Sequence, residues 1–280
     1  MEQNIKTFEF KDLPIEIEVK DLGFVKELPK LLALPHKVTF YQIVWLSKGE
    51  AIFHLDFRDI TLRANEILII SAGQVCQFDT TSDYSGKMIL FTDEFFTVTE
   101  LDLNFLHMAE ILNPVNLNKT VSMCPQLMGS LTSLLEEELK HTDDRFQTGI
   151  AQSYLRVILL ETERRLKTIY SPTFNNIGRQ FYNAVEKHYK ENRNTEFYVQ
   201  LLGINEKALS KEIKALTDKT PKVYIDSRII LEAKRMLSYS NLSAKEIGFK
   251  LGFDEPTNFA KYFRKHTGVT PTQFRDSVRK

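Results

Sequence analysis

Between residues 243 and 275, apolar side chains recur every three or four positions, which is the spacing of amphipathic helices. Ile247 and Leu251 form one short stripe, and Phe259 and Phe263 belong to a second. Gly252 lies between the two stripes, where a left-handed residue commonly ends a helix. The pattern therefore predicts two short helices joined by a tight turn, which is a helix-turn-helix.

Residues with strong end preferences mark the boundaries of these two helices. Ser243 and Glu246 have the spacing of a capping box, so the first helix is predicted to begin there. Asp254 is predicted to cap the second helix, and Pro256 falls in its first turn, where a missing N–H costs little.

The same pattern occurs once more, fifty residues earlier in the chain. The matching pairs are Leu209-Ser-Lys211 with Phe259-Ala-Lys261, Ile213 with Phe263, and Thr220-Pro221 with Thr270-Pro271. Upstream, Leu202-Gly203 matches Leu251-Gly252 at an offset of forty-nine. Pro221–Tyr239 is predicted to be a helix joining two copies of one unit.

Each predicted second helix carries a polar stripe opposite its apolar one. These candidate DNA-binding residues are Lys207, Ser210, Lys211 and Lys214 in the first unit, and Thr257, Asn258, Lys261 and Lys265 in the second. Lysines on one helix are often only a solvated face, but the repetition of the stripe in two units favours DNA. Lysines mostly contact phosphates, whereas Asn258 and Ser210 can hydrogen-bond base edges.

Residues 36 to 92 have a different texture, with short runs rich in β-branched and aromatic residues. The predicted strands are 40–46, 51–55, 66–70 and 87–91, separated by turn signals at 48–50, 63–65, 72–73 and 83–86. Regularly spaced short strands indicate a small β-barrel or jelly roll.

Residues 97 to 174 have a helical pattern. Leu127, Leu131, Leu134, Leu135 and Leu139 form one stripe, and a second helix is predicted from about Phe146 to Tyr170. Such stripes are most often the faces by which helices pack within the same chain.

Composition adds one asymmetry to this picture. With 42% hydrophobic and 26% charged residues the chain is typical of globular proteins, and its net charge is zero. Residues 175–280, however, hold 20 Lys and Arg against 12 Asp and Glu, an excess that suits a phosphate-rich partner. We find no signal peptide or membrane-spanning run, which predicts a cytoplasmic protein without membrane contact.

The C-terminal motifs resemble the AraC-type transcriptional regulators. The residues that carry the resemblance are Arg228-Ile-Ile-Leu-Glu-Ala-Lys234, Ile247-Gly-x-x-Leu-Gly-Phe253, Phe259-Ala-Lys-x-Phe263 and Gly268-Val-Thr-Pro271 with Phe274-Arg275. Ser71-Ala-Gly-Gln-Val75 and Leu90-Phe-Thr-Asp-Glu-Phe-Phe96 resemble the cupin-like sensor domain that often precedes this DNA-binding half.

The resemblance implies a two-domain fold with both α and β structure. We expect a cupin-like β-barrel sensor domain over 1–110, a helical dimerisation and linker region over 111–174, and an all-α domain with two helix-turn-helix units over 175–280. Ser171-Pro172 is the expected junction. The implied function is sequence-specific, effector-responsive transcription regulation by a homodimer, with double-stranded DNA, a small-molecule effector and RNA polymerase as partners.

Two alternatives stay open at this stage. Some cupins are metalloenzymes, and the candidate ligands here are His36, His54, Glu66 and Cys76. Because no His-x-His pair exists, we expect no catalytic residues, no metal and no cofactor, and we predict that the chain is not an enzyme. The second alternative is an interaction module whose basic helices bind an acidic protein.

Overall fold

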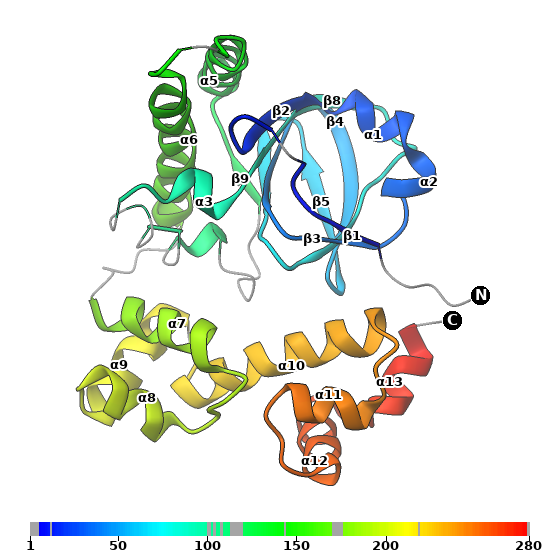
Figure 1. Ribbon diagram of the computed structural model, residues 1–280, viewed down its shortest axis with the longest axis vertical. Helices are drawn as coiled ribbons and strands as arrows, with labels where there is room; N and C mark the ends of the chain where they lie inside the picture. The colour runs from blue at the N-terminus through cyan, green and yellow to red at the C-terminus, as the bar shows by residue number, and fades with distance from the viewer. Residues whose placement is uncertain are drawn as a thin grey trace. The chain divides into compact units, whose positions relative to one another are not determined.

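The computed structural model describes residues 6–11, 13–99, 102, 105–106, 109–112, 120–142, 144–169, 176–217 and 219–278. The chain divides into two units, Lys6–Ser171 and Pro172–Lys280. Figure 1 shows the first as a β-sheet structure with flanking helices and the second as helices alone. The expected junction at Ser171-Pro172 lies outside the described residues.

The first unit is built around one long strand. Its strands are β1 (Lys6–Phe8), β2 (Ile17–Asp21), β3 (His36–Val38), β4 (Tyr41–Leu55), β5 (Arg58–Arg63), β6 (Glu66–Ile70), β7 (Val75–Gln77), β8 (Tyr84–Phe91) and β9 (Thr120–Ser122). Strand β4 pairs antiparallel with β5, β6, β7 and β8. The sheet is extended by β2 on β8, by β9 on β6, and by β3 on β7, with β1 parallel to β3.

The predicted turn at residues 48–50 is wrong, because β4 continues through it. The pairing of β4 with β8 shifts between Leu46 and Lys48, and Gly49 has a φ of 82°. A bulge with a left-handed glycine bends a strand without ending it, so one strand serves both halves of the barrel. In sequence, such a bend has the appearance of a turn.

The other turn signals had mixed outcomes. Asn65 and Gly73 have positive φ in the predicted turns, which confirms both. The turn predicted at 83–86 is wrong, because β8 already begins at Tyr84. Gly86 belongs to this strand, and a Cβ there would lie 1.9 Å from the Trp45 carbonyl oxygen, so it permits close approach of the two backbones.

Alternating residues of β4 enter two different cores. Ile43 and Trp45 pack against the helical layer, whereas Val44 and Leu46 face the barrel interior. Because both faces of the strand are buried, its sequence is a continuous apolar run with little alternation. Gln42 shares the interior face with Val44 and is itself buried.

Short helices and two longer ones complete the first unit. They are α1 (Gly23–Glu27), α2 (Pro29–Leu32), α3 (Asp93–Phe96), the 3₁₀ turn η1 (Glu110–Leu112), α5 (Pro125–Glu138) and α6 (Gln147–Ile169). The two long helices confirm the helical prediction for this region, but β9 lies inside it as a strand. Its three residues are too few for a period to be recognised, and its pairing with β6 is non-local.

The second unit contains α7 (Asn176–His188), α8 (Thr195–Leu202), α9 (Glu206–Thr217), α10 (Pro221–Tyr239), α11 (Ala244–Lys250), α12 (Pro256–Thr267) and α13 (Pro271–Val278). Figure 1 shows α8 and α9 near one end of α10, with α11, α12 and α13 near the other. The two predicted helix-turn-helix units and their connecting helix are therefore present. No helix among the described residues has the length and apolar character needed to span a membrane.

Candidate nucleic-acid interface and barrel cavity

The first helix-turn-helix consists of α8 and α9. Asn194 caps α8 by accepting a hydrogen bond from the Glu196 N–H at 3.3 Å. Gly203 ends the helix with a φ of 62°, a left-handed conformation that glycine adopts without a steric penalty. In α9, Leu209 and Ile213 are fully buried, so this face of the helix is fixed against the rest of the unit.

The second helix-turn-helix begins with the predicted capping box. The Ser243 hydroxyl accepts from the Glu246 N–H at 3.2 Å, and the Glu246 carboxylate accepts from the Ser243 N–H at 2.7 Å. Gly252 follows α11 with a φ of 74°, and a Cβ there would lie 1.9 Å from the Lys190 carbonyl oxygen. Glycine is therefore required at this turn both by conformation and by space.

The start of α12 differs from the prediction by one residue. The N-cap is Glu255 and not Asp254, and its side chain makes no capping hydrogen bond. Pro256 is the first helical residue, as proposed, and its fixed φ suits that position without a side-chain cap.

Aromatic residues bury one face of α12. Phe259 and Phe263 are fully buried, and the Phe263 ring meets the Phe274 ring of α13 edge to face at 5.5 Å. Tyr262 donates its hydroxyl to Asp226 of α10 at 2.7 Å. Burial, together with this carboxylate, raises the pKa of the Tyr262 phenol, so it stays a neutral donor.

The predicted DNA-binding residues lie on the opposite, outward faces. Lys207, Lys211 and Lys214 are exposed on α9, with Ser210 half-buried among them. On α12 the exposed residues are Thr257, Asn258, Lys261 and Lys265. The structure thus places each set on one side of its helix, in line with the predicted period.

Helix α10 connects the two helix-turn-helix units. Its 19 residues match the predicted range, and at 1.5 Å per residue they span about 28 Å. Thr220 caps its start, and the Arg275 guanidinium of α13 donates to the carbonyl oxygens of Leu237 and Leu242 at its other end. A cation at a helix C-terminus also suits the helix dipole.

A buried arginine ties α10 to α7. The Arg228 guanidinium donates to Glu186 at 2.8 Å and to Glu232 at 3.2 Å, and lies 4.1 Å from the centre of the Tyr189 ring. Burial alone would lower the Arg228 pKa, but the two carboxylates raise it, so the group stays charged. Arg228 in the family-like motif is therefore a structural residue that packs α7 onto α10.

The candidate metal ligands of the barrel do not meet at one site. The Cys76 Sγ lies 3.2 Å from the His36 Nε2, and both residues are buried. His54 instead pairs with Asp59 at 2.5 Å on a half-exposed surface, and Glu66 accepts from the Arg63 N–H in a turn. Within the described part of the chain, no three His, Cys, Asp or Glu residues are grouped to hold a metal ion.

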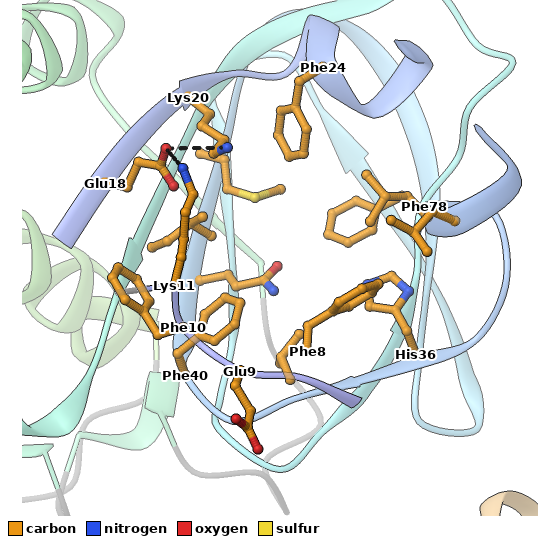
Figure 2. A pocket seen from close by; sticks show the side chains of 16 residues that line it. Phe8, Glu9, Phe10, Lys11, Glu18, Lys20, Phe24, His36, Phe40 and Phe78 are labelled. Atoms are coloured by element: carbon orange, nitrogen blue, oxygen red, sulfur yellow. Dashed lines mark hydrogen bonds and ion pairs between the residues drawn. The ribbon is translucent and has the colours of Figure 1, made fainter. Parts of the chain in front are cut away.

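The interior face of the barrel forms a partly open cavity of about 190 Å³. Figure 2 shows Phe8, Phe10, Phe24, Phe40, Phe78 and His36 around it, with the side chain of Glu9 directed away. The His36 and Phe78 rings stack at 5.7 Å, and the Phe10 and Phe40 rings meet edge to face at 5.5 Å. Such a cavity suits a small, largely apolar molecule.

Apart from His36, a candidate metal ligand, the cavity residues were not among the site residues expected from the sequence. Phe8 and Phe10 precede the segment that the pattern marked as strands, so their role depends on β1 pairing with the distant β3. Gln42 also lines the cavity, although it lies in an apolar run. The sequence feature that could have pointed to the cavity was this one amide side chain between two hydrophobic neighbours, Tyr41 and Ile43.

Comparison with known proteins gives two family matches. A helix-turn-helix domain model matches residues 198–277, and an AraC-like ligand binding domain model matches residues 33–157. The HTH-type transcriptional activator RhaS of Enterobacter sp. (strain 638) is 19% identical over 252 residues, which is 89% of either chain.

Two further similarities differ in extent. Histidine kinase P4 of Formosa agariphila is 29% identical over 132 residues, so the match spans only 10% of that protein. The solved structure of ToxT from Vibrio cholerae matches at 12% identity with a TM-score of 0.46, covering 93% of this chain and 98% of the other.

Proposed function

The chain belongs to the AraC-type transcriptional regulators, DNA-binding proteins with an N-terminal ligand-binding domain, and on this premise we propose which of its residues contact DNA. Helices α9 and α12 enter successive major-groove segments of one duplex. The observation that carries the proposal is the repeated division of these helices into a buried apolar face and an exposed basic face.

The exposed residues divide into two roles. Lys207, Lys211, Lys214, Lys261 and Lys265 neutralise phosphates and supply affinity that is independent of sequence. Asn258, Ser210 and Thr257 offer hydrogen-bonding groups to base edges, and an Asn side chain suits adenine. In this proposal the lysines supply affinity for any duplex, and the short polar side chains supply the preference for a particular sequence.

The length of α10 supports binding to both segments at once. Its span of about 28 Å approaches the ~34 Å between major-groove faces one turn apart. One subunit therefore covers about two turns on one side of the duplex, with modest bending to close the difference.

We further propose that the chain forms a homodimer through α6. Phe146, just before the helix, and Ile150, Val157 and Leu160 within it are 36–56% exposed and follow one another at intervals of four, seven and three residues, which fit a period of 3.5 with one position skipped. This spacing is that of a coiled-coil seam.

Val157→Glu should yield monomers by analytical ultracentrifugation. Val98→Glu, at a 63%-exposed valine outside α6, is the matched control and should leave the dimer intact; dimers in both variants would contradict the assignment.

The effector-responsive part of the function is assigned to the barrel cavity. A regulator of this kind acts where the chromosome is transcribed, so the proposal includes a cytoplasmic location and contact with RNA polymerase. An acidic-protein partner for the basic helices would instead predict no preference between duplex sequences.

Selection from random duplexes tests the proposed function. The full chain is incubated with random DNA, with and without cell extract, and the retained duplexes are sequenced. We expect two short enriched segments one turn apart. A Lys211→Ala, Lys261→Ala double variant should retain less DNA, while Lys140→Ala, at an exposed lysine in the turn after α5, should match the wild type. Retention without any enriched sequence would contradict the proposal.

A further inference from the structure

Gln42 is a buried polar side chain in the wall of an apolar cavity. It is 4% exposed, and its Oε1 atom receives no hydrogen bond from any described residue. Leaving a buried acceptor without a donor carries a free-energy penalty, so such groups in folded proteins usually meet a partner. Oε1 has less than 1 Å² of accessible surface in this rotamer, but Gln42 lines the cavity, so half a turn of its amide group presents this atom to a molecule inside.

The other polar groups around the cavity are already engaged. His36 donates from Nδ1 to the Leu34 carbonyl oxygen at 2.9 Å, and its Nε2 faces the Cys76 thiol at 3.2 Å. Burial lowers the pKa of His36 and raises that of Cys76, so both stay neutral and this pair is self-satisfied. Gln42 Oε1 therefore remains the acceptor available to a ligand among the described lining residues.

Three of the four charged residues of the lining, Lys11, Glu18 and Lys20, are paired with each other, and the fourth, Glu9, is directed away from the cavity. Figure 2 shows Glu18 between Lys11 and Lys20, at 2.9 Å and 3.3 Å from their ammonium groups. The register places Gln42, Leu90 and Glu18 side by side on β4, β8 and β2, so the backbones of Gln42 and Glu18 are about 10 Å apart. The amide and the charged cluster thus start from positions two strands apart, and because these charges are already paired, a neutral ligand needs no counter-charge here.

The size and walls of the cavity define the rest of the ligand. A protein cavity of about 150 Å³ lined by apolar residues binds benzene, and this one is larger at about 190 Å³. Five of its sixteen lining residues are phenylalanines, whose rings favour stacked and edge-on contacts with another ring. A substituted benzene or a bicyclic ring matches both the volume and the surface.

We propose that the barrel cavity binds a small neutral aromatic molecule whose hydroxyl or ring N–H donates a hydrogen bond to Gln42 Oε1. This inference rests on the assignment of the cavity as the effector site and adds the chemistry that the site selects. Gln42 acts as the residue that distinguishes donor-bearing rings from plain hydrocarbon rings of the same shape.

Three bicyclic compounds of nearly equal shape test the proposal directly. Indole carries an N–H donor, indene carries no polar group, and benzofuran carries only an acceptor. Titration calorimetry on the full-length protein without DNA should give indole a Kd about tenfold lower than that of indene or benzofuran. Equal affinities, a preference for benzofuran, or no binding of any of the three would overturn the proposal.

Two glutamine variants separate the hydrogen bond from general packing. Gln42→Met keeps the length of the side chain but removes the acceptor, so indene should bind at least as tightly as indole. Gln126→Met, at an exposed glutamine of α5 outside the cavity, should keep the indole preference. The ligand-free Gln42→Met variant should also melt at a higher temperature, since it no longer buries an unpaired amide; an indole preference that persists in this folded variant would contradict the role of Gln42.

These results are distinguishable from a failure of the proposed function. The calorimetry uses no DNA, and the duplex selection requires no ring compound. A protein that binds indole through Gln42 but selects no DNA sequence would retain the cavity assignment and lose the regulator assignment. A protein that selects a DNA sequence but does not bind indole through Gln42 would lose only the proposed ligand chemistry.

Discussion

Replacement of Phe263 by alanine should strongly destabilise the C-terminal unit. The ring is 0% exposed on α12, and it contacts the rings of Phe259 at 5.9 Å and Phe274 at 5.5 Å. Burying a phenylalanine side chain contributes about 1.5–3 kcal/mol, and the cavity left by its removal brings the expected loss to about 3–5 kcal/mol.

Urea denaturation of the Pro172–Lys280 unit, followed by circular dichroism at 222 nm, measures this loss. With a slope near 2 kcal/mol per M, a loss of about 4 kcal/mol lowers the midpoint by about 2 M. Phe249→Ala is the matched control, because Phe249 lies on the neighbouring α11 but is 48% exposed. It should cost about 1 kcal/mol or less.

The comparison of these two variants tests the orientation of the helix-turn-helix. Equal midpoint shifts in Phe263→Ala and Phe249→Ala, or an unchanged midpoint in Phe263→Ala, would refute the reasoning. In either case the buried face of α12 would be assigned wrongly, and the proposed DNA contacts on its other face would have to be reassigned.

Three further predictions concern charge and recognition. Lys211→Ala and Lys261→Ala should each weaken binding to every duplex and reduce the slope of log affinity against log salt by about one, as measured by fluorescence anisotropy; an unchanged slope with altered sequence preference would exchange their role with that of Asn258. Asn258→Ala should relax preference at one base position at a cost of about 1–3 kcal/mol, as checked on a panel of single-base variants of the selected site, while uniform weakening across the panel would contradict a base contact. Burial opposes ionisation of Asp102, but hydrogen bonds from Thr99 and Arg156 hold its pKa below the ordinary value. Because the pKa of Asp102 is lower in the folded state than the value of about 3.9 in the unfolded state, its ionised form stabilises the fold above about pH 4, and this contribution is lost as the pH falls. The difference in melting temperature between wild type and Asp102→Asn should therefore be largest near pH 7 and shrink below about pH 4. A difference independent of pH would contradict the ionised pair.

The helix-turn-helix units were predictable from sequence because their signals are local. The capping box at Ser243 and the helix-ending Gly252 act within one or two turns of the chain, and the structure confirms both. The assignment of the α12 cap to Asp254 was wrong by one residue, since Pro256 starts that helix without needing a side-chain cap. Repetition at an offset of fifty residues strengthened the whole prediction.

The barrel could be predicted as a class but not in its pairing. Strand β4 was divided at Lys48-Gly49-Glu50 because a glycine bulge and a turn have the same local sequence signals. Strands of three residues, such as β3, β7 and β9, carry too little pattern for recognition and depend on distant partners. For the same reason the cavity, and the place of Gln42 in its wall, could not be predicted, because its lining residues come from strands β1, β2, β4 and β8, which are distant in sequence.

The most direct test of the central claim is footprinting of a selected duplex, with and without half a turn of DNA inserted between its two contacted segments. Because α10, about 28 Å long, connects the two helix-turn-helix units, we expect the Pro172–Lys280 unit to protect about two turns and to lose specific binding after the insertion. Protection of one groove segment, unchanged by the insertion, would contradict the account and show that only one helix-turn-helix reads DNA.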